Sequence, residues 1–144
     1  MLLQQLNRSD AETVKLAVYN SEASYTLAGN QPACLDFRAA AASFGNAVCS
    51  PITSNLGLFY GIVDADIAAG AFGLVQAFGA RASVAVNVGG SSISAAGLIV
   101  GPGAALSSLQ SVGAGKSWQL GPVIVIDNDV SGATAYVHAF IRLL

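Results

Sequence analysis

The chain has 144 residues, of which 53% are hydrophobic and only 10% are charged, so it is neither disordered nor well supplied with charges for a free surface. We therefore expect one domain, with or without an arm, whose surface is partly covered by other protein. The six basic residues are scattered and the net charge is −2, which argues against nucleic acid as a partner.

The chain begins with MLLQQLNR, where the positive charge follows the apolar residues, the reverse of a secretion signal. Its apolar stretches are interrupted long before the roughly 20 residues that a helix needs to span a bilayer. These features predict a protein that is made and folded in a cytoplasm, with no membrane as partner. Such a compartment keeps cysteines reduced, and we interpret Cys34 and Cys49 as small buried hydrophobic residues with free thiols.

The segment at residues 12–19 admits both a helix and a strand. A capping-box pattern at residues 9–12 would open a helix, whereas apolar residues at every second position from Val14 to Val18 are typical of a strand. We favour the strand, because the turn-forming pair Asn20-Ser21 follows it.

Residues 32–37 are expected to pair with that strand as a hairpin, across a loop centred on Gly29-Asn30. The alanine-rich residues 38–45 are the one place where the composition suits a short helix. Together these elements would form an N-terminal arm and hairpin over residues 1–50. A β-domain over residues 51–144 would follow, either as a separate unit or as one continuous domain with the arm.

Period-two patterning predicts an all-β fold, a small barrel or sandwich, for the rest of the chain. Residues 71–78 and 81–88 both alternate in this way, and we expect them to form a hairpin across Gly79-Ala80. The segment Arg81–Lys116 has no charge between its ends and is rich in Gly, Ser and Ala, yet its recurring aliphatic residues indicate that it is folded. Three more strands are expected, at residues 56–63, 122–126 and 134–143.

Three loops imitate known ligand sites, and each departs from its template. Residues 127–132 begin like an EF-hand calcium loop, but His138 stands where a bidentate glutamate is required, so we interpret them as a polar turn. Residues 101–106 lack the third glycine of a dinucleotide fingerprint, and residues 113–117 lack the first glycine of a phosphate loop. We therefore predict neither a metal nor a cofactor.

The candidate catalytic groups also lack the partner residues that catalysis would require. Asp64 and Asp66 would share one face of an extended segment, but their surroundings favour a turn with solvated carboxylates over an acid–base pair. His138 is the only histidine, and the chain has no Gly-x-Ser-x-Gly nucleophile elbow to place a serine beside it. We expect a protein that is not an enzyme.

A series of strand-and-turn segments covers most of the chain: residues 12–21, 26–29, 32–36, 61–63, 67–70, 73–79 and 84–86, closing with 121–126 and 134–143. This succession resembles the capsid decoration, or cement, proteins of tailed phages. The resemblance implies a structural virion protein, made in the host cytoplasm, that clips onto the outside of the capsid and binds the major capsid protein. It also implies a homo-oligomer, commonly a trimer.

Few side chains suit such contacts, and we predict five interface residues. Trp118 is the only tryptophan and follows the uncharged segment, as an interface anchor would, while His138 lies with its neighbours on one face of the last predicted strand. The five are Arg81, Lys116, Trp118, His138 and Arg142. Two alternatives stay open: another β-rich virion component, from the tail or head–tail connector, and a β-sandwich module that binds glycans or other ligands.

Overall fold

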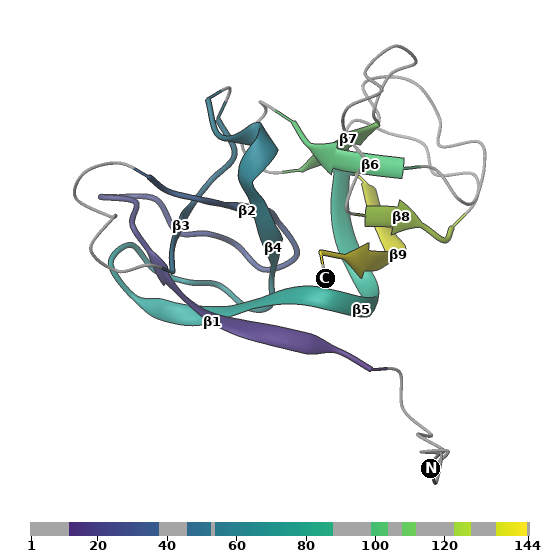
Figure 1. The fold of residues 1–144 in the computed structure, drawn as a ribbon, viewed down its shortest axis with the longest axis horizontal. Coiled ribbons are helices and arrows are strands. Elements are labelled where there is room, and N and C mark those ends of the chain that lie inside the picture. The colour runs from purple at the N-terminus through teal and green to yellow at the C-terminus, as the bar shows by residue number, and fades with distance from the viewer. Residues whose placement is uncertain are drawn as a thin grey trace, which may run out of the picture.

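The computed structural model describes residues 12–37, 46–52, 54–87, 99–103, 108–111, 123–127 and 135–143. These residues form an all-β structure with a single 3-10 turn, η2, which confirms the predicted fold class (Figure 1). The elements are β1 (Val14–Asn20), β2 (Pro32–Leu35), β3 (Ala47–Cys49), η2 (Leu56–Leu58), β4 (Phe59–Val63), β5 (Phe72–Asn87), β6 (Ile99–Pro102), β7 (Leu109–Ser111), β8 (Val123–Val125) and β9 (Ala135–Arg142).

The strands close into two rings that share β5. Sheet order runs β1-β3-β2-β4-β5-β7-β6-β8-β9, and additional pairings join β1 to β5 and β5 to β9. The first ring therefore consists of β1, β3, β2, β4 and β5, and the second ring, a five-stranded barrel, of β5, β7, β6, β8 and β9. In Figure 1, β5 runs beside β1 and then bends into the second ring. Closure of this kind gives each described strand partners on two sides and limits open sheet edges.

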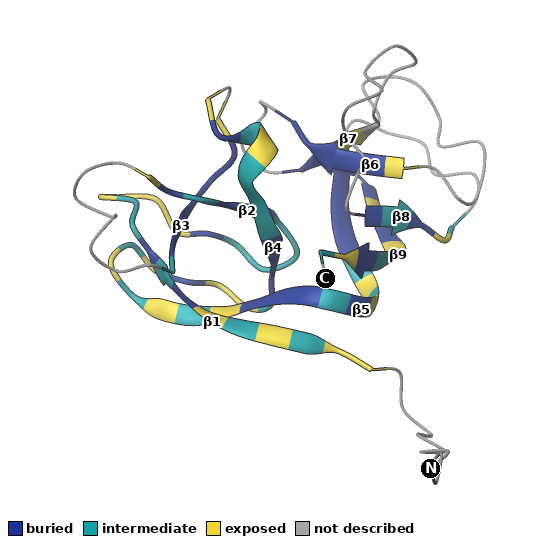
Figure 2. Ribbon diagram, in the orientation of Figure 1, coloured by how far each residue is buried: buried dark blue, intermediate teal, exposed yellow. Residues whose placement is uncertain are grey.

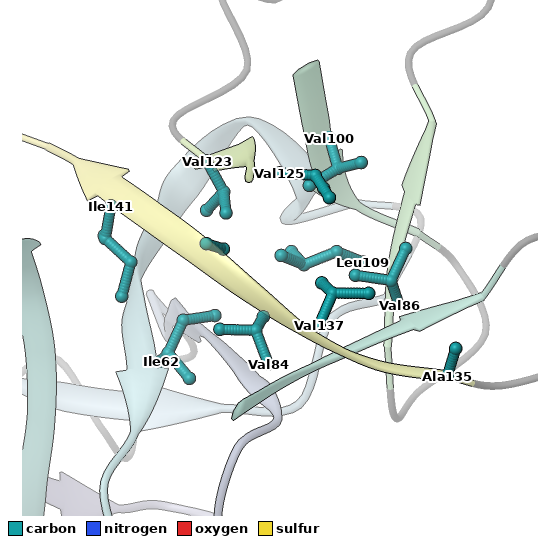
Figure 3. Packing of buried hydrophobic residues seen from close by; sticks show 11 residues of the cluster. Ile62, Val84, Val86, Val100, Leu109, Val123, Val125, Ala135, Val137 and Ile141 are labelled. Atoms are coloured by element: carbon teal, nitrogen blue, oxygen red, sulfur yellow. The ribbon is translucent and has the colours of Figure 1, made fainter. Parts of the chain in front are cut away.

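Each ring encloses its own hydrophobic core, built mainly from β-branched side chains that suit a pleated sheet. The core of the second ring consists of Ile62, Val84, Val86, Val100, Leu109, Val123, Val125, Ala135, Val137, Ala139 and Ile141 (Figure 3). The core of the first ring consists of Val18, Leu27, Ala33, Val48, Val63, Ile67 and Val75. β5 contributes side chains to both cores, and so does β4 through Ile62 and Val63, so these two neighbouring strands couple the rings.

The predicted hairpin across Gly79-Ala80 is wrong, because β5 passes through these residues as one strand of 16 residues. Gly79 has a φ of 104°, but the chain bends there instead of reversing. A Cβ atom at Gly79 would collide with the carbonyl oxygen of Glu12, so the glycine allows the close passage of the chain that leads into β1. A glycine between two alternating segments suits a bend as well as a turn, and local pattern alone does not separate them.

The predicted pairing of residues 12–19 with residues 32–37 is also wrong. Both segments form strands, β1 and β2, but β3 lies between them, parallel to β1 and antiparallel to β2. The sequence gives little sign of β3, because three residues are too few to show a period. The division of the chain at residue 50 stays a prediction, although β1 and β5, from its two sides, pair within one sheet.

The other predicted elements fare differently. Strands at residues 122–126 and 134–143 are confirmed as β8 and β9, whereas the strand expected at residues 56–63 begins only at Phe59, after η2. The uncharged segment Arg81–Lys116 supplies the end of β5 and all of β6 and β7. The helix expected at residues 38–45 lies outside the described residues, as do parts of that uncharged segment.

Candidate interaction surface

The outward side of β9 is the first part of a candidate interaction surface. Along this strand buried residues alternate with exposed or half-buried ones, because successive side chains point to opposite faces of a strand. Ala135, Val137, Ala139 and Ile141 face the core, which leaves Tyr136, His138, Phe140 and Arg142 outside. The sequence places two of the five predicted interface residues, His138 and Arg142, on one strand face, and the structure confirms that placement.

Neighbouring strands extend this surface with apolar side chains. Phe140 pairs with Ile124 of β8, and Ile124 pairs with Ile99 of β6, so one apolar row crosses three strands. Phe78 of β5 packs edge-on against Phe140 with 5.3 Å between the ring centroids. Beside this row the backbone N–H of Ile126 donates to the carbonyl oxygen of His138 at 2.8 Å. We call the set Ile99, Ile124, Ile126, Tyr136, His138, Phe140 and Arg142 the β9 face.

Much of the β9 face is open to solvent. The exposed fraction is 65% for Tyr136 and 50% for Ile126. Single exposed apolar residues are ordinary on protein surfaces, but a contiguous group of them on one sheet face is typical of a contact surface. Interfaces favour tyrosine in such a position because it offers a large apolar ring and a polar tip.

The β9 face also holds an ordered pair of titratable groups, His138 and Asp127. Both carboxylate oxygens of Asp127 lie 3.0 Å from Nδ1 of His138, and the backbone N–H of His138 donates to one of them at 2.6 Å. The backbone hydrogen bond and then the bond to the ring outweigh desolvation and lower the pKa of the Asp127 carboxyl. Asp127 thus fixes the orientation of the His138 ring.

The hydrogen bonds of the His138 ring in the described part of the chain are those to Asp127. His138 has Asp127 as an orienting partner, but no described hydroxyl or thiol hydrogen-bonds to its ring to act as a nucleophile. The described residues also contain no group of three or more His, Cys, Asp or Glu side chains that could hold a metal ion. Residues 128–132 of the EF-hand-like loop lie outside the described residues, so its interpretation as a polar turn stays a prediction.

Arg81, a third predicted interface residue, is turned inward at the irregular part of β5. Its side chain is only 10% exposed. The guanidinium donates to Asn30 Oδ1 at 2.8 Å, to Asp64 Oδ1 at 3.0 Å and to the carbonyl oxygen of Val63 at 3.0 Å. A role at an interface stays a prediction for Arg81, but these contacts make the residue an internal clamp between the β5 bulge and the loops at Asn30 and Asp64.

Asp64 and Asp66 do not act as a pair. Asp64 binds both Lys15, at 2.7 Å, and Arg81, whereas Asp66 accepts a hydrogen bond from the backbone N–H of Gly29 at 2.8 Å. The bond from Lys15 first, and then that from Arg81, outweigh desolvation and lower the pKa of the Asp64 carboxyl. The two carboxylates tie the turn that contains them to other segments, an order that the sequence interpretation of solvated groups did not anticipate.

The last two predicted interface residues, Lys116 and Trp118, lie outside the described residues.

Sequence reasoning also missed a second apolar surface on the first ring. Phe72, 68% exposed, and Leu74 project from β5, and Tyr19 of β1 packs against Phe72 with 5.2 Å between ring centroids. We call Tyr19, Phe72 and Leu74 the β5 face. In Figure 2, exposed and half-buried residues alternate along the first part of β1 and at the start of β5. The period-two pattern was a usable signal, but it does not say which side faces a core.

Comparison with protein-family models and with curated proteins found no relative of this chain. No protein-family model matches the sequence, and no curated protein matches it. Among the described residues, none forms a helix of the length and apolar character needed to cross a membrane.

Proposed function

We propose that this protein is a structural component of a phage virion, a capsid decoration or cement protein that binds the outer shell and stabilises contacts between major capsid subunits. The observation that supports the proposal best is the β9 face, a sheet face that carries several exposed apolar side chains in a chain with only 10% charged residues. The strand-and-turn resemblance supplies the class of partner. The protein would act through binding energy alone, without a catalytic step.

Stabilisation of a shell in this way follows from mass action. A protein that binds the assembled shell, and not its separated subunits, lowers the free energy of the assembled state by its binding free energy. Bridging requires at least two contact areas on each copy. The chain offers two apolar areas on different rings, the β9 face and the β5 face, so one copy has the surfaces to contact two neighbours. A homo-oligomer, for which we propose a trimer, would multiply these contacts.

Co-sedimentation with phage heads tests the proposal. Wild-type protein is expected to migrate with heads purified from a lysate of the source phage, and Tyr136→Ala is expected to reduce the retained fraction at least about tenfold, as loss of a buried aromatic anchor does. Tyr25→Ala is a matched control, because Tyr25 is also exposed but belongs to neither the β9 face nor the β5 face. Circular dichroism checks that both variants fold.

Other outcomes separate the alternatives. Wild-type protein that stays in the supernatant with heads but binds purified tails or connectors would point to another virion position. Binding to a glycan array without binding to any virion part would point to a ligand-binding module, and the cement proposal would then be abandoned.

A further inference from the structure

The two cysteines of the chain lie directly opposite each other. Strand β2 pairs antiparallel with β3, and the register places Cys34 against Cys49 and Leu35 against Val48. Both cysteines are free thiols in the structure, and their exposed fractions are 0% and 2%. The sequence separation of the two residues gives no sign of this register, which depends on β3 lying between β1 and β2.

Residues that face each other in an antiparallel ladder are within reach of a disulfide. Their Cα atoms lie about 4.5 or 5.5 Å apart, depending on the type of pair, and both spacings fall within the roughly 4.4–6.8 Å that disulfides span. Directly opposite side chains also lie on the same face of the sheet. Cys34 and Cys49 therefore need no rearrangement of the strands to come together.

A loop covers one of the thiols. Asn55, itself buried, donates from Nδ2 to Sγ of Cys49 at 3.0 Å and to the carbonyl oxygen of Ser50 at 3.3 Å, and its Oδ1 accepts from the backbone N–H of Ile52 at 2.7 Å. Burial, with a contribution from Cys49, raises the pKa of the Cys34 thiol from 9.0 to about 12. The thiolate of Cys34, the reactive form, is therefore scarce in the folded protein.

We propose that Cys34 and Cys49 form a redox-sensitive latch, which stays reduced while Asn55 covers Cys49 and becomes a cross-strand disulfide when Asn55 moves away in the presence of a small-molecule disulfide. The disulfide would join β2 to β3 covalently and fix the first ring. This inference rests on the register and the Asn55 contacts, and it stands apart from the proposed function.

The chemistry is two thiol–disulfide exchanges with oxidised glutathione as oxidant. The thiolate of one cysteine attacks a glutathione sulfur, which breaks the glutathione S–S bond, forms a mixed disulfide and releases one glutathione thiolate. The thiolate of the other cysteine attacks the protein sulfur of this mixed disulfide and releases the second glutathione. The two protein protons end on the two glutathione thiols, so the protein is oxidised by two electrons and the glutathione disulfide is reduced by two.

Equilibrium in glutathione buffers tests the geometry. The protein is refolded from the reduced, urea-unfolded state at a series of glutathione redox ratios, so that burial does not limit the rate, and the same chain is held in concentrated urea under the same ratios. Alkylation and mass spectrometry then count the free thiols. We expect the effective concentration of the two thiols to be at least about tenfold higher in the folded protein than in urea, since the fold holds them together. An equal or lower value in the folded protein, or a product that is mainly mixed or intermolecular disulfide, would overturn the proposal.

Two variants sharpen the test. The double substitution V48C/C49V keeps the composition but moves the thiol to the face that points into the first core, so we expect it to lose the tenfold gain; retention of the gain would show that register is not its cause. Asn55→Ala removes the contacts that hold the loop over Cys49. It is expected to raise the alkylation rate of the native protein several-fold, and an unchanged rate would refute the role of Asn55 as a gate.

Discussion

The side chain of Arg81 joins β5 to the loops at Asn30 and Asp64 through several hydrogen bonds. Its guanidinium satisfies the side chains of Asn30 and Asp64 and the carbonyl oxygen of Val63 from within a bulge of β5. In the absence of those donors, partly buried acceptors would be left without partners, and an unpaired buried acceptor is costly. The sequence suggested an interface residue because Arg81 begins the uncharged segment Arg81–Lys116; that role stays a prediction, while the side chain itself is only 10% exposed.

Arg81→Met is expected to lower the free energy of unfolding by about 3 kcal/mol, because it keeps the apolar stem but leaves these acceptors unsatisfied. Urea denaturation followed by circular dichroism measures the change. Arg142→Met, on the exposed side of β9, is the control and should change stability by no more than about 0.5 kcal/mol. A similar small change for both variants would mean that the internal contacts of Arg81 contribute little.

Asp64 gives the first ring a stability that depends on pH. Its pKa in the folded protein is lower than the ordinary value of 3.8, first because of Lys15 and then because of Arg81. A lowered folded pKa means that the stabilisation is complete above 3.8 and is lost as the pH falls through the folded value. We expect wild type to be more stable than Asp64→Asn at neutral pH, and this difference to shrink as the pH falls below 3.8. Denaturation curves of both proteins over a pH series measure this difference in stability.

A direct titration separates the causes of the lowered pKa of Asp64. The pKa of Asp64, followed by carboxyl NMR, should rise in Lys15→Met, since Lys15 makes the largest contribution to lowering it. An unchanged pKa in that variant would show that the Lys15 ion pair does not persist in solution, as is common for exposed pairs.

At the scale of elements, β5 determines the architecture. It pairs with β1 and β4 near its start and with β7 and β9 toward its end, so its bend lies where the pairing passes from one ring to the other. The bend requires a residue that adopts positive φ and carries no Cβ. A strand that is bent by a glycine can serve two sheets where a straight strand would serve one.

Gly79→Ala is therefore expected to destabilise the protein by more than about 2 kcal/mol, from the strained φ together with the collision with the Glu12 carbonyl oxygen. Thermal unfolding reports the loss. Gly57→Ala in η2 serves as a matched control, because nothing lies within 4 Å of a Cβ at that position. If both alanine variants melt at the wild-type temperature, the close passage at Gly79 is not a constraint in solution.

On the scale of the whole molecule, two small cores share side chains from two neighbouring strands, β4 and β5. Neither ring has a large core of its own, and a domain with few buried residues is marginally stable. Because β5 contributes side chains to both cores, disruption of one core should also destabilise the other. The molecule is then expected to unfold as one cooperative unit.

Ile141→Ala, in the core of the second ring, tests this coupling. It should lower the free energy of unfolding by about 2–4 kcal/mol, as truncation of a buried isoleucine does. Native-state hydrogen exchange is expected to show the same loss of protection at β1 in the first ring as at β9. Protection at β1 that stays at the wild-type level would show instead that the rings unfold separately.

Much of this protein could be predicted from its sequence, and the reason is local. Alternation along β9 predicts the strand and the side that carries His138 and Arg142, because successive side chains point to opposite faces whatever the strand pairs with. The same reasoning predicts the all-β class, and the low charge predicts exposed apolar surface such as the β9 face. These properties depend on residue type and spacing alone.

Tertiary structure alone decided which strands meet and where particular side chains point. The insertion of β3 between β1 and β2 puts Cys34 opposite Cys49, and the continuity of β5 through Gly79 creates two rings in place of a hairpin. The bulge after Arg81 turns an expected surface charge into an internal clamp. Strand pairing joins residues far apart in the chain and is selected by the burial of whole cores, so no short stretch of sequence contains enough information to fix it.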